Sequence, residues 1–156
     1  MSYSKDVAYA LLNAAVAGDL ERVEWLLEGG AHDNSPRLFE NFSALHGACG
    51  EGFIPIVKKL LQHGSNVNAV TTDCGMTALM MACKGGYLEV VKDLIEAGAD
   101  VNAARTTDGM TPLMYACMSG SLEIVQVLLI NNANPRSVTT DGHDAFYYVA
   151  EYENTH

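Results

Sequence analysis

Basic residues are scarce in this sequence of 156 residues, where nine Lys and Arg stand against 19 Asp and Glu. The formal net charge of −10 repels a phosphate backbone, which excludes nucleic acid as the expected ligand and suits a basic partner. No apolar run reaches the roughly 18 residues that a membrane-spanning helix needs. Lys5 and Asp6 interrupt the one N-terminal apolar stretch that could act as a signal peptide. We therefore expect no membrane partner and residence in the cytoplasm or nucleus.

Motifs of catalytic and metal sites are also missing. The sequence has no G-x-S-x-G, H-E-x-x-H or Walker signature. Gly47, Gly50 and Gly52 have the spacing of a dinucleotide fingerprint in reverse, but a true fingerprint follows a strand and opens a helix. His32 and His63 are scattered, so no cluster of His, Cys and carboxylates forms. We expect no catalytic residue, no metal and no cofactor.

What the sequence does contain is an internal repeat with a constant step, seen most clearly in residues 76–103. The columns that keep this step are Leu11, Leu45, Leu79 and Leu113; Ala14, Ala48, Ala82 and Ala116; Val23, Val57, Val91 and Val125; and Gly18, Gly52, Gly86 and Gly120. Self-similarity at a fixed period of roughly 34 residues is typical of stacked supersecondary units.

Each unit is predicted to contain two short helices. In the third unit Thr77 is a candidate N-cap, and apolar residues recur at helical spacing from there to Gly86. A second helix starts at about Leu88 and ends at Gly98, because glycine adopts the left-handed conformation that closes helices. Helices this short are marginal alone, so each unit must bury its apolar face on its neighbours.

The cysteines follow the same repeat. Cys49, Cys83 and Cys117 keep its step and occupy equivalent positions in three units. Packed helices lie about 8–10 Å apart, whereas the Cα atoms of a disulfide lie within about 7 Å. These three are therefore predicted to be buried, unpaired thiols, while Cys74 falls in a turn and is the one plausible exposed thiol.

Several stretches in register resemble the ankyrin repeat. Residues 111–116, Thr-Pro-Leu-Met-Tyr-Ala, are similar to the Thr-Pro-Leu-His-x-Ala signature of that family, and residues 98–103 and 120–125 fit the same unit. The resemblance implies an all-α ankyrin-repeat solenoid of stacked helix-turn-helix units with projecting fingers. Its predicted parts are repeat 1 (1–38, an N-terminal cap), repeat 2 (39–72), repeat 3 (73–106), repeat 4 (107–139) and a C-terminal half-repeat (140–156).

The signature histidine of the family occurs only as His46, and Met80 and Met114 take its place in later units. In the family this imidazole ties the Thr or Ser hydroxyl and the backbone of adjacent units together. We expect that link at His46 and packing alone at the two methionines. In the half-repeat, Gly142 falls one residue early. The resemblance gives structural roles to His46, Thr77, Thr111, Gly52, Gly86 and Gly120.

The resemblance also implies a partner-binding surface on the concave side of the array, formed by finger ends and first helices. The candidate residues are Phe42, Met76, Met110 and His143 at finger ends; Glu51, Lys84 and Met118 near the ends of first helices; and Met81, Tyr115 and Tyr148 before the signature alanine or its equivalent. Such a Met-rich and aromatic set is typical of adaptable recognition surfaces. Met81 and Tyr115 could instead pack between adjacent first helices.

Two residues outside these columns are also candidates for function. Residues 100–102, Asp-Val-Asn, resemble the asparagine-hydroxylation sequence of the family, which makes Asn102 a candidate for that modification. Trp25 is either a partly exposed packing residue of the cap or part of a second contact surface.

Three hypotheses of function follow. The first is a non-catalytic adaptor, expected to be a monomer, that binds a protein with a basic or apolar surface through the concave face. The second is an inhibitor or regulatory subunit that occludes an enzyme or a transcription factor, because the length and repeat number resemble those of cyclin-dependent kinase inhibitors. The third, an enzyme, would need at least two ionisable groups within reach of each other, and the sequence offers no such pair.

Overall fold

The computed structural model describes residues 2–33 and 42–155, with side chains from residue 6 onward. The helices within these residues are α1 (Ser2–Ala17), α2 (Leu20–Glu28), α3 (Ala44–Glu51), α4 (Ile54–Gln62), α5 (Ala78–Gly85), α6 (Leu88–Glu96), α7 (Pro112–Met118), α8 (Leu122–Ile130) and α9 (Ala145–Thr155). In the same residues, no helix is both long enough and apolar enough to cross a membrane.

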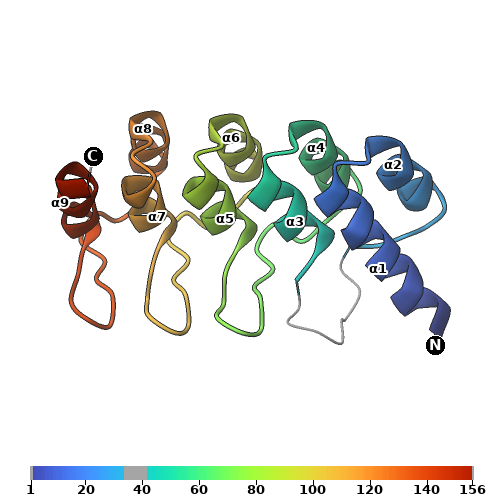
Figure 1. Ribbon diagram of the computed structural model, residues 1–156, viewed down its shortest axis with the longest axis horizontal. Helices are drawn as coiled ribbons and strands as arrows, with labels where there is room; N and C mark the ends of the chain where they lie inside the picture. The colour runs from blue at the N-terminus through green and yellow to red at the C-terminus, as the bar shows by residue number, and fades with distance from the viewer. Residues whose placement is uncertain (1, 34–41, 156) are drawn as a thin grey trace.

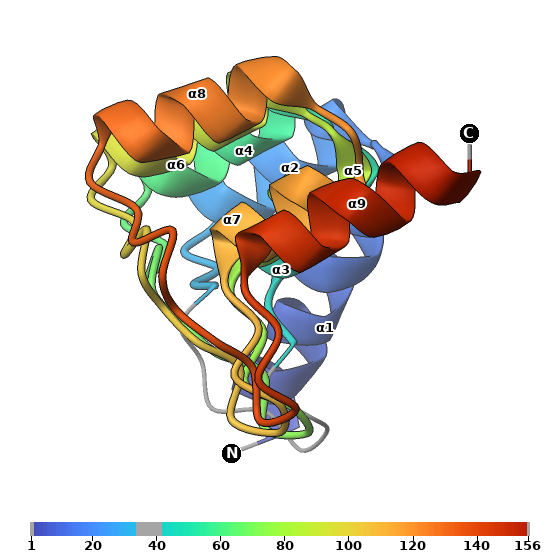
Figure 2. The same cartoon turned by 90° about the vertical axis from the view of Figure 1, so that its left-hand side faces the viewer.

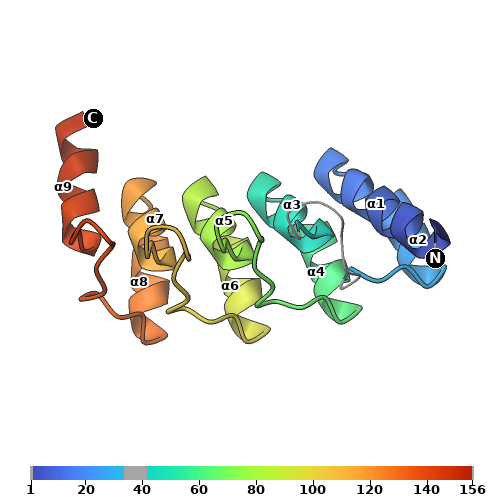
Figure 3. The same ribbon diagram turned by 90° about the horizontal axis from the view of Figure 1, so that it is seen from below.

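The helices form two parallel rows. The first helices of the units, α1, α3, α5, α7 and α9, pack on one another in chain order, and the second helices, α2, α4, α6 and α8, do the same. Figure 3 shows the two rows from below. In this view α1 and α9, the two ends of the first-helix row, reach further toward the top of the picture than α3, α5 and α7. The predicted all-α solenoid of stacked helix pairs is confirmed.

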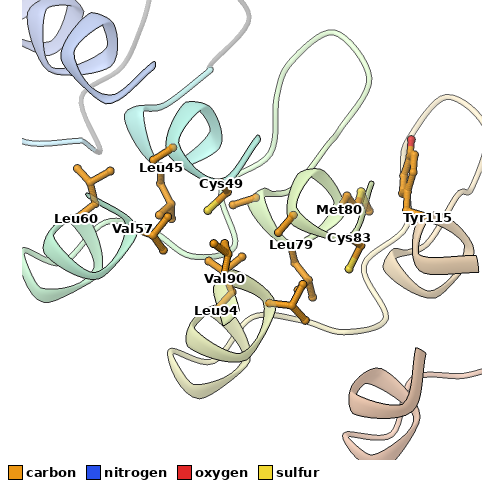
Figure 4. Packing of buried hydrophobic residues seen from close by; sticks show 14 of the residues in the cluster. Leu45, Cys49, Val57, Leu60, Leu79, Met80, Cys83, Val90, Leu94 and Tyr115 are labelled. Atoms are coloured by element: carbon orange, nitrogen blue, oxygen red, sulfur yellow. The ribbon is translucent and has the colours of Figure 1, made fainter. Parts of the chain in front are cut away.

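The core is continuous along the array because the same positions are buried in every full unit. Leu11, Leu45, Leu79 and Leu113 are at most 2% exposed. In Figure 4 the side chains of Leu45 and Leu79 lie among those of the second helices, such as Val57 and Val90. Each buried side chain of this size contributes about 1.5–3 kcal/mol, which is what keeps helices of seven to nine residues folded.

Side-chain caps begin the first helices. The hydroxyl groups of Ser43, Thr77 and Thr111 accept hydrogen bonds from the backbone N–H three residues later, at 3.3, 3.2 and 3.4 Å. Asp144 caps α9 in the same way, because its carboxylate accepts from the N–H of Tyr147 at 3.1 Å. The step from the cap at Thr111 to the cap at Asp144 is therefore one residue shorter than the step from Thr77 to Thr111.

The fingers explain this shorter step. The backbone N–H of Thr71 donates to the carbonyl of Met76, and that of Arg105 to the carbonyl of Met110, five residues on in each case. In the last finger, Thr139 donates to His143 after only four residues. The early Gly142, at φ 80°, thus marks a finger that is one residue shorter. The neighbouring fingers lie side by side at the bottom of Figure 1.

Glycine and asparagine in the left-handed conformation end the second helices. Gly30, Gly64 and Gly98 have φ of 86°, 78° and 90°, and Asn132 has φ of 67°. Gly52 and Gly86 cap first helices with the same conformation, while Gly120 lies two residues beyond the end of α7.

Candidate functional site

The first helices and the finger ends form one continuous surface, which we call the first-helix face. It lies on the side of the array away from the second helices, as Figure 3 shows. All ten residues predicted to bind a partner come from these elements. Glu51, Lys84 and Met118 are exposed, and the Met118 side chain is 45% exposed. Phe42, Met76, Met81, His143 and Tyr148 are half-buried.

Tyr115 does not belong to the exposed surface, because it is only 3% exposed. Its hydroxyl accepts a hydrogen bond from Nη1 of Arg105 at 2.6 Å, and Nε of that arginine lies 3.4 Å from Oδ1 of Asp108. Burial raises the pKa of the Tyr115 phenol, and the hydrogen bond from Arg105 partly opposes that rise. Tyr115 therefore ties the fourth finger to α7, which corrects its predicted role as an exposed contact.

Met110 also requires a correction, since it is 8% exposed and lies within the buried core cluster. Its backbone N–H donates to Oδ1 of Asp108 at 3.1 Å, so the finger holds Met110 with its side chain in the core. Met76, at the equivalent place in the third finger, only packs against the edge of that cluster. The finger ends therefore do not expose a uniform methionine column.

His46 is a structural residue at the junction between repeats 2 and 3. The backbone N–H of Ser43 donates to its Nδ1 at 3.1 Å, so Nδ1 is the acceptor and Nε2 carries the proton. Nε2 then donates to the carbonyls of Ala69 at 3.1 Å and Met76 at 3.2 Å. The ring is 1% exposed and stacks on Phe42, so it is not available to a substrate or a metal.

Met80 and Met114 occupy the equivalent positions and are 0% and 1% exposed. Their thioethers fill the space by packing. In the part of the chain that the structure describes, no group of three or more His, Cys, Asp and Glu side chains could hold a metal ion.

Comparison with known protein families gives a match over most of the chain. A family model described as "ankyrin repeats (3 copies)" matches the chain over three overlapping ranges, residues 11–105, 45–139 and 102–156. The chain belongs to the ankyrin repeat family. Ankyrin repeats are in general protein–protein interaction modules, and ankyrin repeat domains are typically non-enzymatic scaffolds. No curated protein matches the chain.

Within this ankyrin array, the last finger presents an aromatic cluster that the sequence did not predict. The imidazole of His143 stacks on the ring of Tyr147 at 3.7 Å between centroids, with an angle of 3° between planes. Tyr148 meets both rings edge-on, at 6.4 Å from His143 and 5.3 Å from Tyr147. The same four-residue spacing places Phe42 on His46 in repeat 2, with 5.6 Å between their ring centroids. A contact between residues so close in sequence was hidden only by the uncertain register.

Asn102 is part of a second link between ankyrin repeats. Its amide nitrogen donates to the carbonyl of Asn132 at 3.0 Å, and its amide oxygen accepts from the backbone N–H of Asn134 at 2.7 Å. Asn68 makes the same pair of bonds one repeat earlier, to Gly98 and Asp100. Both asparagines are exposed. A modifying enzyme acting on Asn102 would reach an accessible side chain whose amide is already bonded.

Trp25 is 69% exposed on α2, where Asp19, Glu21 and Arg22 lie around a shallow hollow. It therefore lies outside the first-helix face. The cysteines at equivalent positions of the ankyrin units, Cys49, Cys83 and Cys117, are buried and free. The fourth cysteine, Cys74, is half-buried in the third finger.

Proposed function

We propose that this ankyrin array binds a protein partner through the first-helix face and acts as a non-catalytic adaptor. The observation that supports this most strongly is the set of methionines accessible on adjacent units: Met76 and Met81 in repeat 3 and Met118 in repeat 4. Unbranched, polarizable side chains adapt to the shape of a partner. A face that only contacts water has no need of them.

The charge of the protein supports a partner with a basic surface. A net charge of −10 attracts a positively charged protein over distances of about a Debye length and raises its association rate. Glu51, exposed at the end of α3, places one of these acids on the first-helix face itself. Apolar contact at the centre with acids at the edge is a common arrangement in protein interfaces. All four cysteines are free, which supports residence in the reducing cytoplasm or nucleus.

The test compares Met118→Lys with Gln62→Lys, using each variant as bait for capture from cell extract. Both substitutions add one positive charge at an exposed position, but Gln62 ends α4 in the second-helix row. Loss of an interface anchor typically costs about 1 kcal/mol or more, so Met118→Lys should weaken capture of the wild-type partner at least about fivefold. Gln62→Lys should capture it as the wild type does.

Equal capture by both variants would refute the proposal that the first-helix face is the binding surface. Capture repeated in about 0.5 M salt, where screening is strong, separates the contributions of charge and apolar contact. If the captured partner is an enzyme, measuring its activity with and without the ankyrin protein distinguishes a neutral adaptor from an inhibitor. A fall in activity at saturation would favour the inhibitor.

A further inference from the structure

In α9, the positions that are buried in the earlier first helices carry exposed apolar residues. In the register set by the Asp144 cap, Phe146, Tyr147 and Val149 are the equivalents of Leu113, Met114 and Ala116. The earlier three are 2%, 1% and 0% exposed, but Phe146 is 70% exposed and Tyr147 and Val149 are each 39% exposed. The half-repeat thus keeps large apolar or aromatic side chains where nothing in the described chain covers them.

Helix α8, the last in the second-helix row, also has exposed apolar residues at positions that are covered in the preceding unit. Glu24 on α2 pairs with Lys59 on α4 at 2.9 Å, which identifies the side of a second helix that faces the next unit. In each second helix, the residues four before and three after the position equivalent to Glu24 lie on this same side. On α8 these are Leu122 and Leu129, which are 63% and 43% exposed. Their counterparts on α6 are half-buried.

The exposed apolar residues of α8 and α9 lie at the same end of the array, and we call them the C-terminal end face. Figure 2 views the molecule from this end, with α8 and α9 nearest the viewer. It consists of Leu122, Leu129 and Ile130 of α8 and Phe146, Tyr147 and Val149 of α9. The exposed fractions of the six residues sum to on the order of 600 Å², taking about 150–250 Å² for an aromatic side chain and somewhat less for Leu, Ile and Val. That is at the upper limit for a patch on a monomer and approaches the roughly 800 Å² per partner of a standard interface.

The opposite end of the array is a poor partner for this surface. Ile56, Val90 and Ile124 are buried at one equivalent position of α4, α6 and α8. In α2 that position is the exposed Arg22, beside Asp19 and Glu21. Stacking the N-terminal end of one copy on the C-terminal end of another would bury these charged side chains against apolar residues, which is costly. Head-to-tail filaments are therefore disfavoured.

We propose that two copies of this chain pair through their C-terminal end faces around a two-fold axis. In this arrangement the same apolar patch contributes from both sides, as a two-fold interface requires. The pairing replaces the monomer expected from the sequence. It leaves the part of the first-helix face on α3, α5 and α7 open, so it does not compete with partner binding at Met76, Met81 and Met118. Because each copy carries a charge of −10, screening by salt strengthens the dimer, whereas it weakens binding of a basic partner.

The test is the mass of the full chain in solution, measured by sedimentation equilibrium from about 1 to 100 µM protein at low and at about 0.5 M salt. We expect a reversible dimer whose dissociation constant falls as salt rises. Phe146→Glu and Leu122→Glu should each raise that constant at least about a hundredfold. Both side chains are largely exposed, so thermal unfolding should confirm that these variants fold.

Trp25→Glu is the matched control, since it replaces an exposed aromatic residue at the other end of the array, and it should dimerise as the wild type does. Met118→Lys should also leave the dimer unchanged. A wild-type monomer throughout the concentration range would overturn the proposal. So would growth beyond a dimer, a dimer unaffected by Phe146→Glu, or a dimer broken by Trp25→Glu or Met118→Lys.

Discussion

The junction between repeats 2 and 3 and the junction between repeats 3 and 4 have the same architecture but different chemistry. In the first, the Nδ1 atom of His46 accepts from the Ser43 N–H, and Nε2 donates to the carbonyl of Ala69 near the end of repeat 2 and to that of Met76 in repeat 3. In the second, Met80 occupies the same place at 0% exposure and fills it by packing. The step along the chain is the same at both junctions. The apolar columns therefore set the geometry of the array, and the histidine bonds are added to it.

Repeat 4 is tied to repeat 3 by a polar link in another place. There Arg105 replaces the threonine found at Thr71 and Thr139, and its guanidinium bonds to Tyr115. Asp108 takes over the role of the threonine hydroxyl by accepting from the N–H of Met110. The array holds its fingers in more than one way, and substitutions at each tie should show how much each contributes.

The largest effect is expected from His46→Ala. This change creates a cavity, typically costing about 2–5 kcal/mol for a large buried side chain. It also removes the partner of the Ser43 N–H and of the Ala69 carbonyl, while the Met76 carbonyl keeps its hydrogen bond from the Thr71 N–H. We expect the free energy of unfolding in urea to fall by about 4 kcal/mol. Met80→Ala, the matched control, creates a cavity without unpaired polar groups and should cost about 2–3 kcal/mol. Equal losses would mean that the histidine bonds contribute nothing net.

The thiols at the three first-helix junctions should differ in reactivity. Burial raises the pKa of Cys49 and Cys83 far above the ordinary range and that of Cys117 to about 11. Because the thiolate is the reactive form, timed alkylation at pH 8 with mass spectrometry should modify the half-buried Cys74 first. Cys117 should follow at least about tenfold faster than Cys49 and Cys83. Modification of Cys49 as fast as Cys117 would contradict this order.

Tyr115→Phe tests the tie in repeat 4. The phenyl ring keeps the packing, but the partly buried Arg105 loses its acceptor at 2.6 Å, so stability should fall by about 1 kcal/mol. Tyr147→Phe, at an exposed phenol, should change stability by less than about 0.5 kcal/mol. A double-mutant cycle with Arg105→Gln would measure the coupling directly. A coupling energy of zero would show that Arg105 and Tyr115 do not stabilise the fold through their hydrogen bond.

The smallest effect concerns Asp93 of α6, whose carboxylate faces Lys58 of α4 at the first of the two junctions. Burial raises the pKa of its carboxyl, and Lys58 at 3.8 Å only partly opposes this. A raised pKa means that the protonated form favours the fold, so this contribution is lost as pH rises through the folded-state pKa. Asp93→Asn should therefore gain a few tenths of a kcal/mol at pH 7 and nothing near pH 3. A loss of stability at pH 7 would show that the Lys58 pair outweighs the burial.

The periodic parts of this protein could be predicted from its sequence. Leu45, Leu79 and Leu113 mark the core because burial recurs with the repeat, and His46 could be assigned through the family signature. Periodicity determines which positions are equivalent. It does not determine how far a side chain at such a position is exposed.

That limit explains the errors at Tyr115 and Met110. Tyr115 and Met118 lie on one helix, but the guanidinium of Arg105 in the fourth finger bonds to the Tyr115 hydroxyl and the tyrosine is buried. This arginine departs from the repeat, so the repeat did not reveal the contact. Likewise, Phe146 fits the core pattern in sequence, and only the absence of a covering helix in the described chain exposes it. Both features depend on neighbours that one repeat cannot reveal.

The paired bonds of Asn68 and Asn102 have a chemical consequence. Each side chain needs both halves of its amide, the nitrogen to donate to a carbonyl and the oxygen to accept from an N–H of the following unit. Deamidation to aspartate would keep the acceptor but place a negative charge against the carbonyl of Gly98 or Asn132. Spontaneous deamidation of these two residues would thus weaken the contacts between neighbouring units at their loops and leave the packing of the helices unchanged.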